Sequence, residues 1–251
     1  MLDFPIYVVT AGHLTDRHLH LKNVADKYNL TFEYIESFDP KDLENLPELR
    51  AKFGNNLPIN SISCFLKHFE AQRRLVASNN DFCMILEDDI VFLEDSLETR
   101  LSTVLSQIPN LKEKWLIFLG GADNKLDSHF FLEANPSLLL EAQMTTAEAY
   151  LVSRESCIER LKWFEEANLI DNALDHLITR LDEELHIQHL RPVCALATQG
   201  SITGKFETTL DASRGKHSRI YLHIKYLLNR FRRQSFPRFV AAIRIAFGAF
   251  K

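Results

Sequence analysis

The stretch that most constrains the fold is residues 82–92, Phe-Cys-Met-Ile-Leu-Glu-Asp-Asp-Ile-Val-Phe. Five apolar residues run directly into the carboxylates of Glu87, Asp88 and Asp89, and apolar residues resume at Ile90. A short apolar run without polar alternation predicts a strand that is buried on both faces, as in a parallel sheet covered by helices. The chain is therefore predicted to be an α/β protein built around this strand.

Three adjacent carboxylates at the end of a buried strand repel one another and are costly to desolvate unless a positive group lies beside them. A divalent cation such as Mg²⁺ or Mn²⁺ takes carboxylate oxygens and often shares them with substrate phosphates. Ligands of open α/β sheets bind beyond the carboxyl ends of the strands, where this block is expected to lie. The block thus predicts a cation and phosphate site; the alternative is an acidic turn after a core strand.

The composition is that of a globular protein with a packed core. Of the 251 residues, 46% are hydrophobic and 25% are charged, which is ordinary for a soluble domain. The N-terminus has no signal-peptide pattern, and no apolar stretch is long enough to cross a bilayer. The four cysteines are widely spaced and form no Cys-x2-Cys pair, so we expect reduced, mostly buried thiols of a cytosolic protein.

Charge is distributed unevenly along the chain. The formal net charge is −5, yet no Asp or Glu follows Asp211, while ten Lys and Arg residues do. Residues 1–211 therefore carry about −15 and residues 212–251 about +10. We predict one folded domain over residues 1–211, followed by a basic, amphipathic helical tail over residues 212–251.

Hydrophobic periodicity predicts strands that alternate with helices, which argues for one layered α/β domain. The predicted strands are residues 5–10, 30–37, 82–86, 115–119, 138–140, 149–152 and 186–190, the last stopping before Pro192. The predicted helices are residues 17–28 with Asp16 as their cap, 61–77, 93–107, 154–167 and 172–184, with short helices and loops over 39–53.

Several blocks of the chain resemble one known family. In order, they are Ile6-Tyr-Val-Val with Arg17 downstream, Phe32-Glu-Tyr with Phe38-Asp39, Cys64-x3-His68, Ile85-Leu-Glu-Asp-Asp-Ile, Ala149-Tyr-Leu-Val-Ser and Asp171. Over about residues 5–203 this order is similar to the family 25 glycosyltransferases, which include bacterial lipooligosaccharide galactosyltransferases. Where that family has Gly-Cys-x2-Ser-His, this chain has Ser63 and Lys67, and downstream Gln199 and Ser201-Ile202 match loosely.

The resemblance implies a GT-A-like fold, a Rossmann-like and mostly parallel sheet flanked by helices. It also implies a UDP-sugar donor, a divalent cation (Mn²⁺ or Mg²⁺) and inverting transfer. The predicted function is transfer of a hexose, with galactose expected, to a lipooligosaccharide or lipopolysaccharide acceptor at the cytoplasmic face of the inner membrane. Two alternative functions remain open. One is a sugar nucleotidylyltransferase, which should show a Gly-rich basic loop where this chain has Thr10-Ala-Gly-His. The other is a non-catalytic membrane-associated adaptor.

The spacing within the acidic block suggests a division of roles. In extended backbone, Glu87 and Asp89 face the same side. We expect Asp89 to bind the cation directly and Glu87 to contact it through water or to contact the ribose. Asp88 is expected to face the other way, toward a backbone amide or a sugar hydroxyl.

Inverting transfer needs a base on the face opposite the leaving group. Asp171 is the first candidate, because it matches the family's aspartate at a predicted helix start. Asp175 lies one turn further along the same helix face and is the alternative. The plain reading of Asp171 is an ordinary helix N-cap.

Four residues near the ends of the first two predicted strands are expected to lie near the nucleotide: Thr10, Arg17, Phe38 and Asp39. Arg17 is a candidate partner of the diphosphate; otherwise it is a surface residue of a solvated helix.

His68 falls among the apolar positions of a predicted helix. Its match to the family makes it a candidate donor contact, although a satisfied core histidine is the favoured reading. Gly120 and Gly121 follow a predicted strand and could line the sugar pocket, but glycines are also common in loops that follow strands.

Residues 217–251 mix aliphatic and aromatic residues with arginines and contain no acid. Pro237 is predicted to separate two helices. Basic amphipathic helices of this kind lie on anionic membrane surfaces. The alternative is a helical pair packed on the acidic domain, while so much interleaved aliphatic content argues against nucleic acid as a partner.

Overall fold

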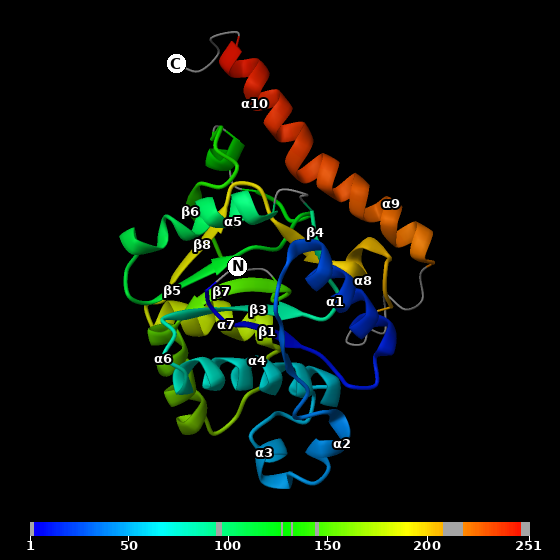
Figure 1. Ribbon diagram of the computed structural model, residues 1–251, viewed down its shortest axis with the longest axis vertical. Coiled ribbons are helices and arrows are strands. Elements are labelled where there is room, and N and C mark those ends of the chain that lie inside the picture. Colours follow the sequence, from blue (N-terminus) through cyan, green and yellow to red (C-terminus); the bar gives the residue numbers. More distant parts are fainter. Residues whose placement is uncertain are drawn as a thin grey trace.

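The computed structural model describes residues 3–93, 97–126, 128–131, 133–143, 146–207 and 218–246. Its centre is a seven-stranded sheet with the order β2-β1-β3-β7-β5-β8-β6 (Figure 1). The strands are β1 (Ile6–Val9), β2 (Glu33–Ile35), β3 (Phe82–Glu87), β5 (Trp115–Phe118), β6 (Leu139–Glu141), β7 (Ala149–Ser153) and β8 (Gln188–Pro192).

Five of these seven strands run in the same direction. β1 pairs in parallel with β2 and with β3, and β5 pairs in parallel with β8. β7 is antiparallel to both β3 and β5, and β6 is antiparallel to β8. The predicted α/β class, with a mostly parallel sheet flanked by helices, is confirmed.

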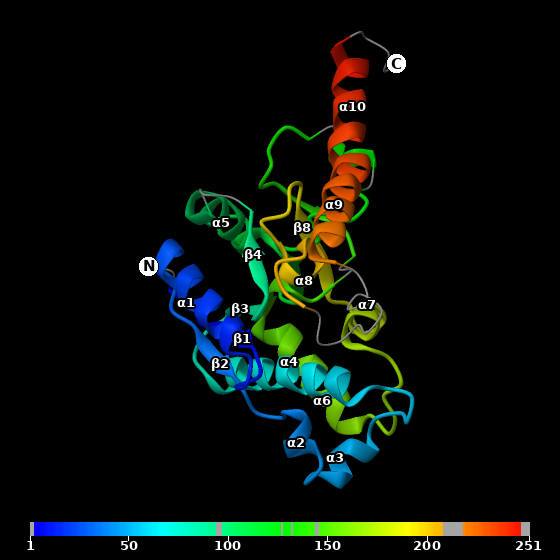
Figure 2. The ribbon, with the colours of Figure 1, turned by 90° about the vertical axis from the view of Figure 1, so that its right-hand side faces the viewer.

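Helices cover both faces of the sheet (Figures 1 and 2). Tyr7 and Val9 of β1 pack in the core cluster that contains residues of α4, α6 and α7. Ile6 and Val8 pack in the opposite cluster with residues of α1 and α5, because successive side chains of a strand point to opposite faces. The helices are α1 (Thr15–Tyr28), α4 (Ile59–Ala77), α5 (Leu97–Leu105), α6 (Arg154–Glu166) and α7 (Leu174–Glu184).

The strand that precedes the acidic block lies in the middle of the sheet, between β1 and β7. Its residues Cys83 to Leu86 are at most 1% exposed, so the prediction of a strand buried on both faces is confirmed. Glu87, the last residue of β3, therefore lies beside the carboxyl end of β1.

A second, two-stranded sheet was not predicted. It pairs β4 (Ile90–Phe92) antiparallel with β9 (Ala197–Gln199), and the short helix α8 (Gly200–Thr203) follows. The pairing brings residues about 110 positions later in the chain beside the acidic block. Two further short helices, α2 (Pro40–Leu43) and α3 (Pro47–Ala51), occupy the region predicted as short helices and loops.

Several predicted boundaries differ from the structure, three of them in informative ways. Helix α1 begins at Thr15 with Leu14 as its N-cap, so Asp16 lies in the first turn rather than at the cap. Strand β8 ends at Pro192, whereas the prediction stopped earlier; Pro192 lies beyond the pairing with β5, which ends at Leu190, and is opposite Leu139 of the edge strand β6. Helix α5 is described over Leu97–Leu105, so it ends two residues before the predicted end at residue 107; residues 94–96 of the predicted helix lie outside the described residues.

The described part of the tail is one continuous helical rod that leaves the body of the molecule (Figure 1). α9 (Arg219–Arg230) continues through a π-helical turn (Phe231–Ser235) into α10 (Phe236–Ala246). The predicted break at Pro237 is wrong, because the proline lies at the second residue of α10, just after the wider π turn, where a missing N–H is accommodated. The predicted domain boundary at residues 211 and 212 lies outside the described residues.

Candidate active site

A cavity of about 430 Å³ opens at the carboxyl ends of β1 and β3. The start of α4, the start of α7 and the segment from β9 to α8 complete its walls. A larger cavity of about 680 Å³ lies along β8 and the end of α7, and no predicted site residue is among those that line it. The smaller cavity brings together six predicted residues: Thr10, Arg17, Glu87, Asp88, Asp89 and Asp175.

The acidic block bends at the edge of the sheet. Glu87 is the last residue of β3, whereas Asp88 and Asp89 form the turn that leads into β4. The expectation that Asp88 faces away from its neighbours assumed extended backbone. The turn at Asp88 and Asp89 does not meet this assumption, and all three residues line the same cavity.

Asp88 is neutralised within the protein. Its carboxylate pairs with the guanidinium of Arg17 and accepts a hydrogen bond of 3.0 Å from the Thr10 hydroxyl. Burial raises the pKa of Asp88, and Arg17 beside it partly opposes this increase. Arg17 is itself only 9% exposed and also donates to the Glu207 carbonyl, so the reading of Arg17 as a surface residue is wrong.

Asp89 has one oxygen held by the protein and one without a partner. Its Oδ2 accepts a hydrogen bond of 2.9 Å from the backbone N–H of Ser201. Its Oδ1 is buried and has no hydrogen-bond partner among the residues that the structure describes. A buried polar atom in this state costs about 1–3 kcal/mol, so Oδ1 is suited to receive a positively charged ligand.

Glu87 is held by two residues from distant parts of the chain. Its Oε2 accepts a hydrogen bond of 2.9 Å from the Gln199 side chain, and its Oε1 lies 3.7 Å from His68 Nε2. Burial raises the pKa of Glu87 from 4.5 to about 8, and the charge of Asp89 adds to this increase. Glu87 therefore carries a proton at neutral pH when no cation lies beside it.

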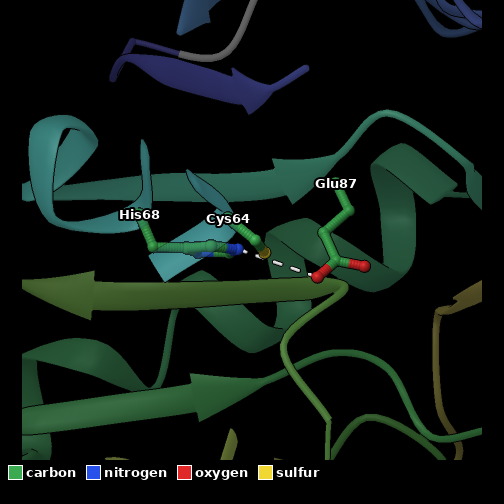
Figure 3. A group of neighbouring side chains, drawn as sticks. All are labelled: Cys64, His68 and Glu87. Carbon is green, nitrogen blue, oxygen red and sulfur yellow. Dashed lines mark ion pairs between the residues drawn. The ribbon is translucent and has the colours of Figure 1, made fainter. Parts of the chain in front are cut away.

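His68 lies behind the cavity wall rather than on it. Its ring is fully buried, and its Nδ1 is 2.9 Å from the Tyr150 hydroxyl. Burial lowers the pKa of His68 to about 3, and Arg160 adds to this decrease, so the ring is neutral. The prediction that His68 is a core histidine agrees with this burial. Its second ring nitrogen, Nε2, nevertheless faces Glu87 (Figure 3).

Lys67 is a cavity residue that was not predicted as part of the site. Its buried ammonium group donates to the Thr10 carbonyl and pairs with the Asp39 carboxylate. Asp39 therefore lies beside the cavity without lining it. Phe38 has a φ of 64° and packs against the core, and it is not among the lining residues.

Gly120 and Gly121 lie against a buried carboxyl group rather than on the cavity. The N–H of Gly121 donates to Glu148 Oε1 at 2.7 Å, and a Cβ on Gly120 would lie 2.3 Å from the same oxygen. At position 120 glycine is thus required by the close approach of the backbone to Glu148, whereas Gly121 has a φ of 77° that favours glycine. Burial raises the pKa of Glu148 to about 7.

The two candidate bases have different surroundings. Helix α7 begins at Leu174 with Ala173 as its N-cap, so the reading of Asp171 as the cap is wrong. Asp171 is exposed, accepts a hydrogen bond from the Asn172 side chain and does not line the cavity. Asp175 lies in the first turn of α7 and does line it.

Sequence reasoning missed several residues that line the cavity: Cys64, Lys67, Gln199 and Ser201. Cys64, Gln199 and Ser201 were noted only as matches to a family pattern, and Lys67 only as a departure from one. The β4–β9 pairing that brings Gln199 and Ser201 to the block has no signal in local periodicity.

A family model described as "Glycosyltransferase family 25 (LPS biosynthesis protein)" matches residues 4–162, which is more than half of the chain. The chain belongs to glycosyltransferase family 25. The family 25 match includes β1, α4 and the whole acidic block, while α7 and the segment from β9 to α8 lie beyond it. The predicted family resemblance is confirmed.

Two curated relatives carry the same family name. A "Glycosyltransferase 25 family member" of Aedes aegypti is 22% identical over 199 residues, which are 74% of this chain and 33% of that protein. One of Drosophila pseudoobscura pseudoobscura is 23% identical over 167 residues, 62% of this chain and 26% of that protein. The chain thus spans a third or less of these relatives.

A solved structure, "Crystal structure of S. aureus TarS 1-349", aligns with 93% of this chain and 73% of that chain. The sequence identity is 13% and the TM-score is 0.43.

The oxygen atoms that this family 25 cavity offers as metal ligands suit a hard divalent cation. Asp89 offers Oδ1, which no other described residue contacts by a hydrogen bond, and Glu87 offers a carboxylate in the same cavity. Oxygen ligands of this kind suit Mg²⁺ and Mn²⁺. Asp88 is less available, because Arg17 already occupies it.

Proposed function

We propose that this family 25 chain transfers a hexose, with galactose the expected sugar, from a UDP-sugar to a lipooligosaccharide or lipopolysaccharide acceptor. One observation carries the proposal: Asp89 lines the cavity beyond β1 and β3, and its buried Oδ1 has no hydrogen-bond partner among the residues that the structure describes. Family membership favours glycosyl transfer over nucleotidyl transfer and over an adaptor role.

In this proposal Asp89 binds Mn²⁺ or Mg²⁺ directly, and Glu87 assists through water or contacts the ribose. The bound cation supplies Lewis acidity that stabilises the charge developing on the departing diphosphate. A cation held by Asp89 would favour the charged form of the neighbouring Glu87 over its protonated form. Thr10 and Arg17 lie where the nucleotide is proposed to bind, and Arg17 keeps Asp88 in place.

Asp175 is the proposed general base. Its carboxylate lies in the first turn of α7, on the cavity that also holds the acidic block. Inverting transfer requires a group that takes the acceptor hydroxyl proton on the face opposite the leaving group. Asp171 is the weaker candidate, because it does not line the cavity.

We also propose that the tail attaches the enzyme to the inner face of the inner membrane, where a lipid-linked acceptor would be found. Within the described residues, no helix combines the length and apolar character needed to span a bilayer. The rod from α9 to α10 instead exposes a row of large apolar side chains: Ile220, Tyr221, Ile224, Leu227, Leu228, Phe231, Phe236, Phe239 and Ile243. Basic amphipathic helices with such a face bind anionic lipid surfaces.

The donor reaction tests the main proposal. In Mn²⁺ and without acceptor, Asp89→Asn should lower the rate of UDP-galactose hydrolysis at least about 100-fold, since even outer-shell partners of a metal contribute 10–100-fold. Asp26→Asn, an exposed residue of α1, is the matched control and should keep the wild-type rate. Unchanged hydrolysis by Asp89→Asn would remove the metal assignment.

A further inference from the structure

We infer that Cys64, His68 and Glu87 form a binding site for a thiophilic divalent metal such as Zn²⁺. The sulfur, ring nitrogen and carboxylate oxygen all lie within 4.8 Å of one another, and Figure 3 shows the three side chains converging. This site goes beyond the proposed function and does not rest on it, although Glu87 takes part in both.

The local fold explains why two of the ligands face the same way. Cys64 and His68 are four residues apart on α4, and such residues lie one above the other on a helix face. The same spacing holds paired metal ligands on helices of zinc enzymes. The third ligand, Glu87, is delivered by the end of β3, which packs under this helix.

His68 provides the observation that points to a ligand. Its side chain is 0% exposed, and its Nε2 has no hydrogen-bond partner within the part of the chain that the structure describes. Glu87 Oε1 lies 3.7 Å from this nitrogen, too far for a hydrogen bond. A metal ion between the two would satisfy a nitrogen that burial otherwise leaves unpaired.

The spacing is close to that of a bound ion. Zinc binds nitrogen and oxygen at about 2.0–2.2 Å and sulfur at about 2.3 Å in tetrahedral geometry, which places two ligand atoms about 3.4 Å apart. The distance of 3.7 Å between His68 Nε2 and Glu87 Oε1 is within reach of that value by small side-chain movements. The sulfur must approach by somewhat more, since the whole set spans up to 4.8 Å.

Two ligands are also held from behind, as ligands in metal sites are. The Tyr150 hydroxyl lies 2.9 Å from His68 Nδ1, which leaves Nε2 free to face the site. Gln199 donates to Glu87 Oε2 at 2.9 Å, which leaves Oε1 toward His68.

The ligand chemistry separates this site from the one proposed for Mn²⁺. Sulfur and imidazole favour Zn²⁺ over the hard cations, which prefer carboxylate and phosphate oxygens. Cys64 and Glu87 both line the cavity, so the ion can enter from it and keep a fourth position open. Zinc bound here would engage Glu87 and so should oppose Mn²⁺ at Asp89.

Cobalt substitution tests the site, because Co²⁺ bound to a thiolate has a near-ultraviolet charge-transfer band. Titration of the metal-free full chain with Co²⁺ should produce this band, and Zn²⁺ should abolish it. Cys64→Ser should remove the band and weaken Zn²⁺ binding at least about tenfold. Cys194→Ser, which changes a cysteine of similar exposure outside the cluster, should keep it.

A second measurement uses the wild-type chain, so its result does not depend on whether a variant folds. Zn²⁺, but not Mg²⁺, should slow the alkylation of Cys64 by iodoacetamide at least about tenfold, as mapped by mass spectrometry. Asp89→Asn should keep the cobalt band even if it loses donor hydrolysis, which separates the two proposals. No thiolate band in the wild type, a band retained in Cys64→Ser, or equal alkylation with and without Zn²⁺ would each overturn the inference.

Discussion

Asp171 and Asp175 are four residues apart, yet only Asp175 lines the cavity. We therefore expect Asp175→Asn to lower kcat for transfer to an acceptor by about 10²–10⁴-fold, the range that a general base contributes. Asp171→Asn should stay near the wild-type kcat, because the side chain is exposed and its one described partner is the adjacent Asn172.

Steady-state kinetics with a truncated oligosaccharide acceptor would measure both variants. UDP binding should be unchanged in each, which distinguishes a lost base from a lost donor site. A loss of kcat in Asp171→Asn together with normal turnover by Asp175→Asn would reverse the assignment.

At the same scale, some contacts of the site could be read from the chain and others could not. The prediction that the acidic block follows a buried strand is correct, because an uninterrupted apolar run in the sequence indicates such a strand. The pair of Arg17 with Asp88 and the contacts of Lys67 join residues far apart in sequence. Local pattern contains no information about such pairs.

Helix α10 and the π turn before it attach the tail to the body through polar contacts. The side chain of Gln234 donates to the carbonyls of Gly121 and Asn124, and Arg238 donates to that of Val193. The rod also carries the exposed apolar residues named above. The tail is thus packed on the protein, as one of the two hypotheses for it predicted. It also exposes apolar side chains to solvent, as the other hypothesis requires.

This arrangement predicts that Leu228→Glu weakens binding of the full chain to anionic vesicles about tenfold or more. The substitution removes roughly 1.5–3 kcal/mol of apolar burial and adds repulsion from the lipid charge. Leu169→Glu is the matched control, since Leu169 is equally exposed, at 63%, but lies outside the tail.

Vesicle sedimentation at several salt concentrations would measure the effect. Binding by the wild type should weaken as salt rises, because basic residues contribute to it. Equal loss in both variants, or none in either, would contradict the proposed membrane contact.

For the whole molecule, the buried carboxyl groups predict how stability depends on pH. Burial raises the pKa of Glu87 to about 8 and of Glu148 to about 7, against 4.5 for an ordinary glutamate. Between pH 4.5 and these values the folded chain keeps protons that the unfolded chain has lost. The stabilising contribution is therefore complete below pH 4.5 and is lost as the pH rises through 7 and 8.

We expect wild type to lose on the order of 2–4 kcal/mol more stability than Glu87→Gln between pH 5 and pH 8, since one pK unit corresponds to about 1.4 kcal/mol. Urea unfolding in metal-free buffer would measure it. The difference between the two proteins cancels other titrating groups, such as His68, whose lowered pKa acts in the opposite direction. Parallel pH profiles of the two proteins would contradict the raised pKa.

The sequence by itself determined where most strands and helices lie, which strand is buried on both faces, and that its end carries three carboxylates. These are consequences of side-chain periodicity, which is a local property of the chain. The tertiary structure alone decided that β7 is antiparallel, that β9 returns to β4, and that Asp175 rather than Asp171 reaches the cavity.

The same division holds within the candidate zinc site. Helical spacing already places Cys64 and His68 on one face of α4, whereas Glu87 joins them only because β3 packs beneath that helix. Which distant segments meet depends on how the whole chain buries its apolar surface, and that is a sum over contacts that no single stretch of sequence contains.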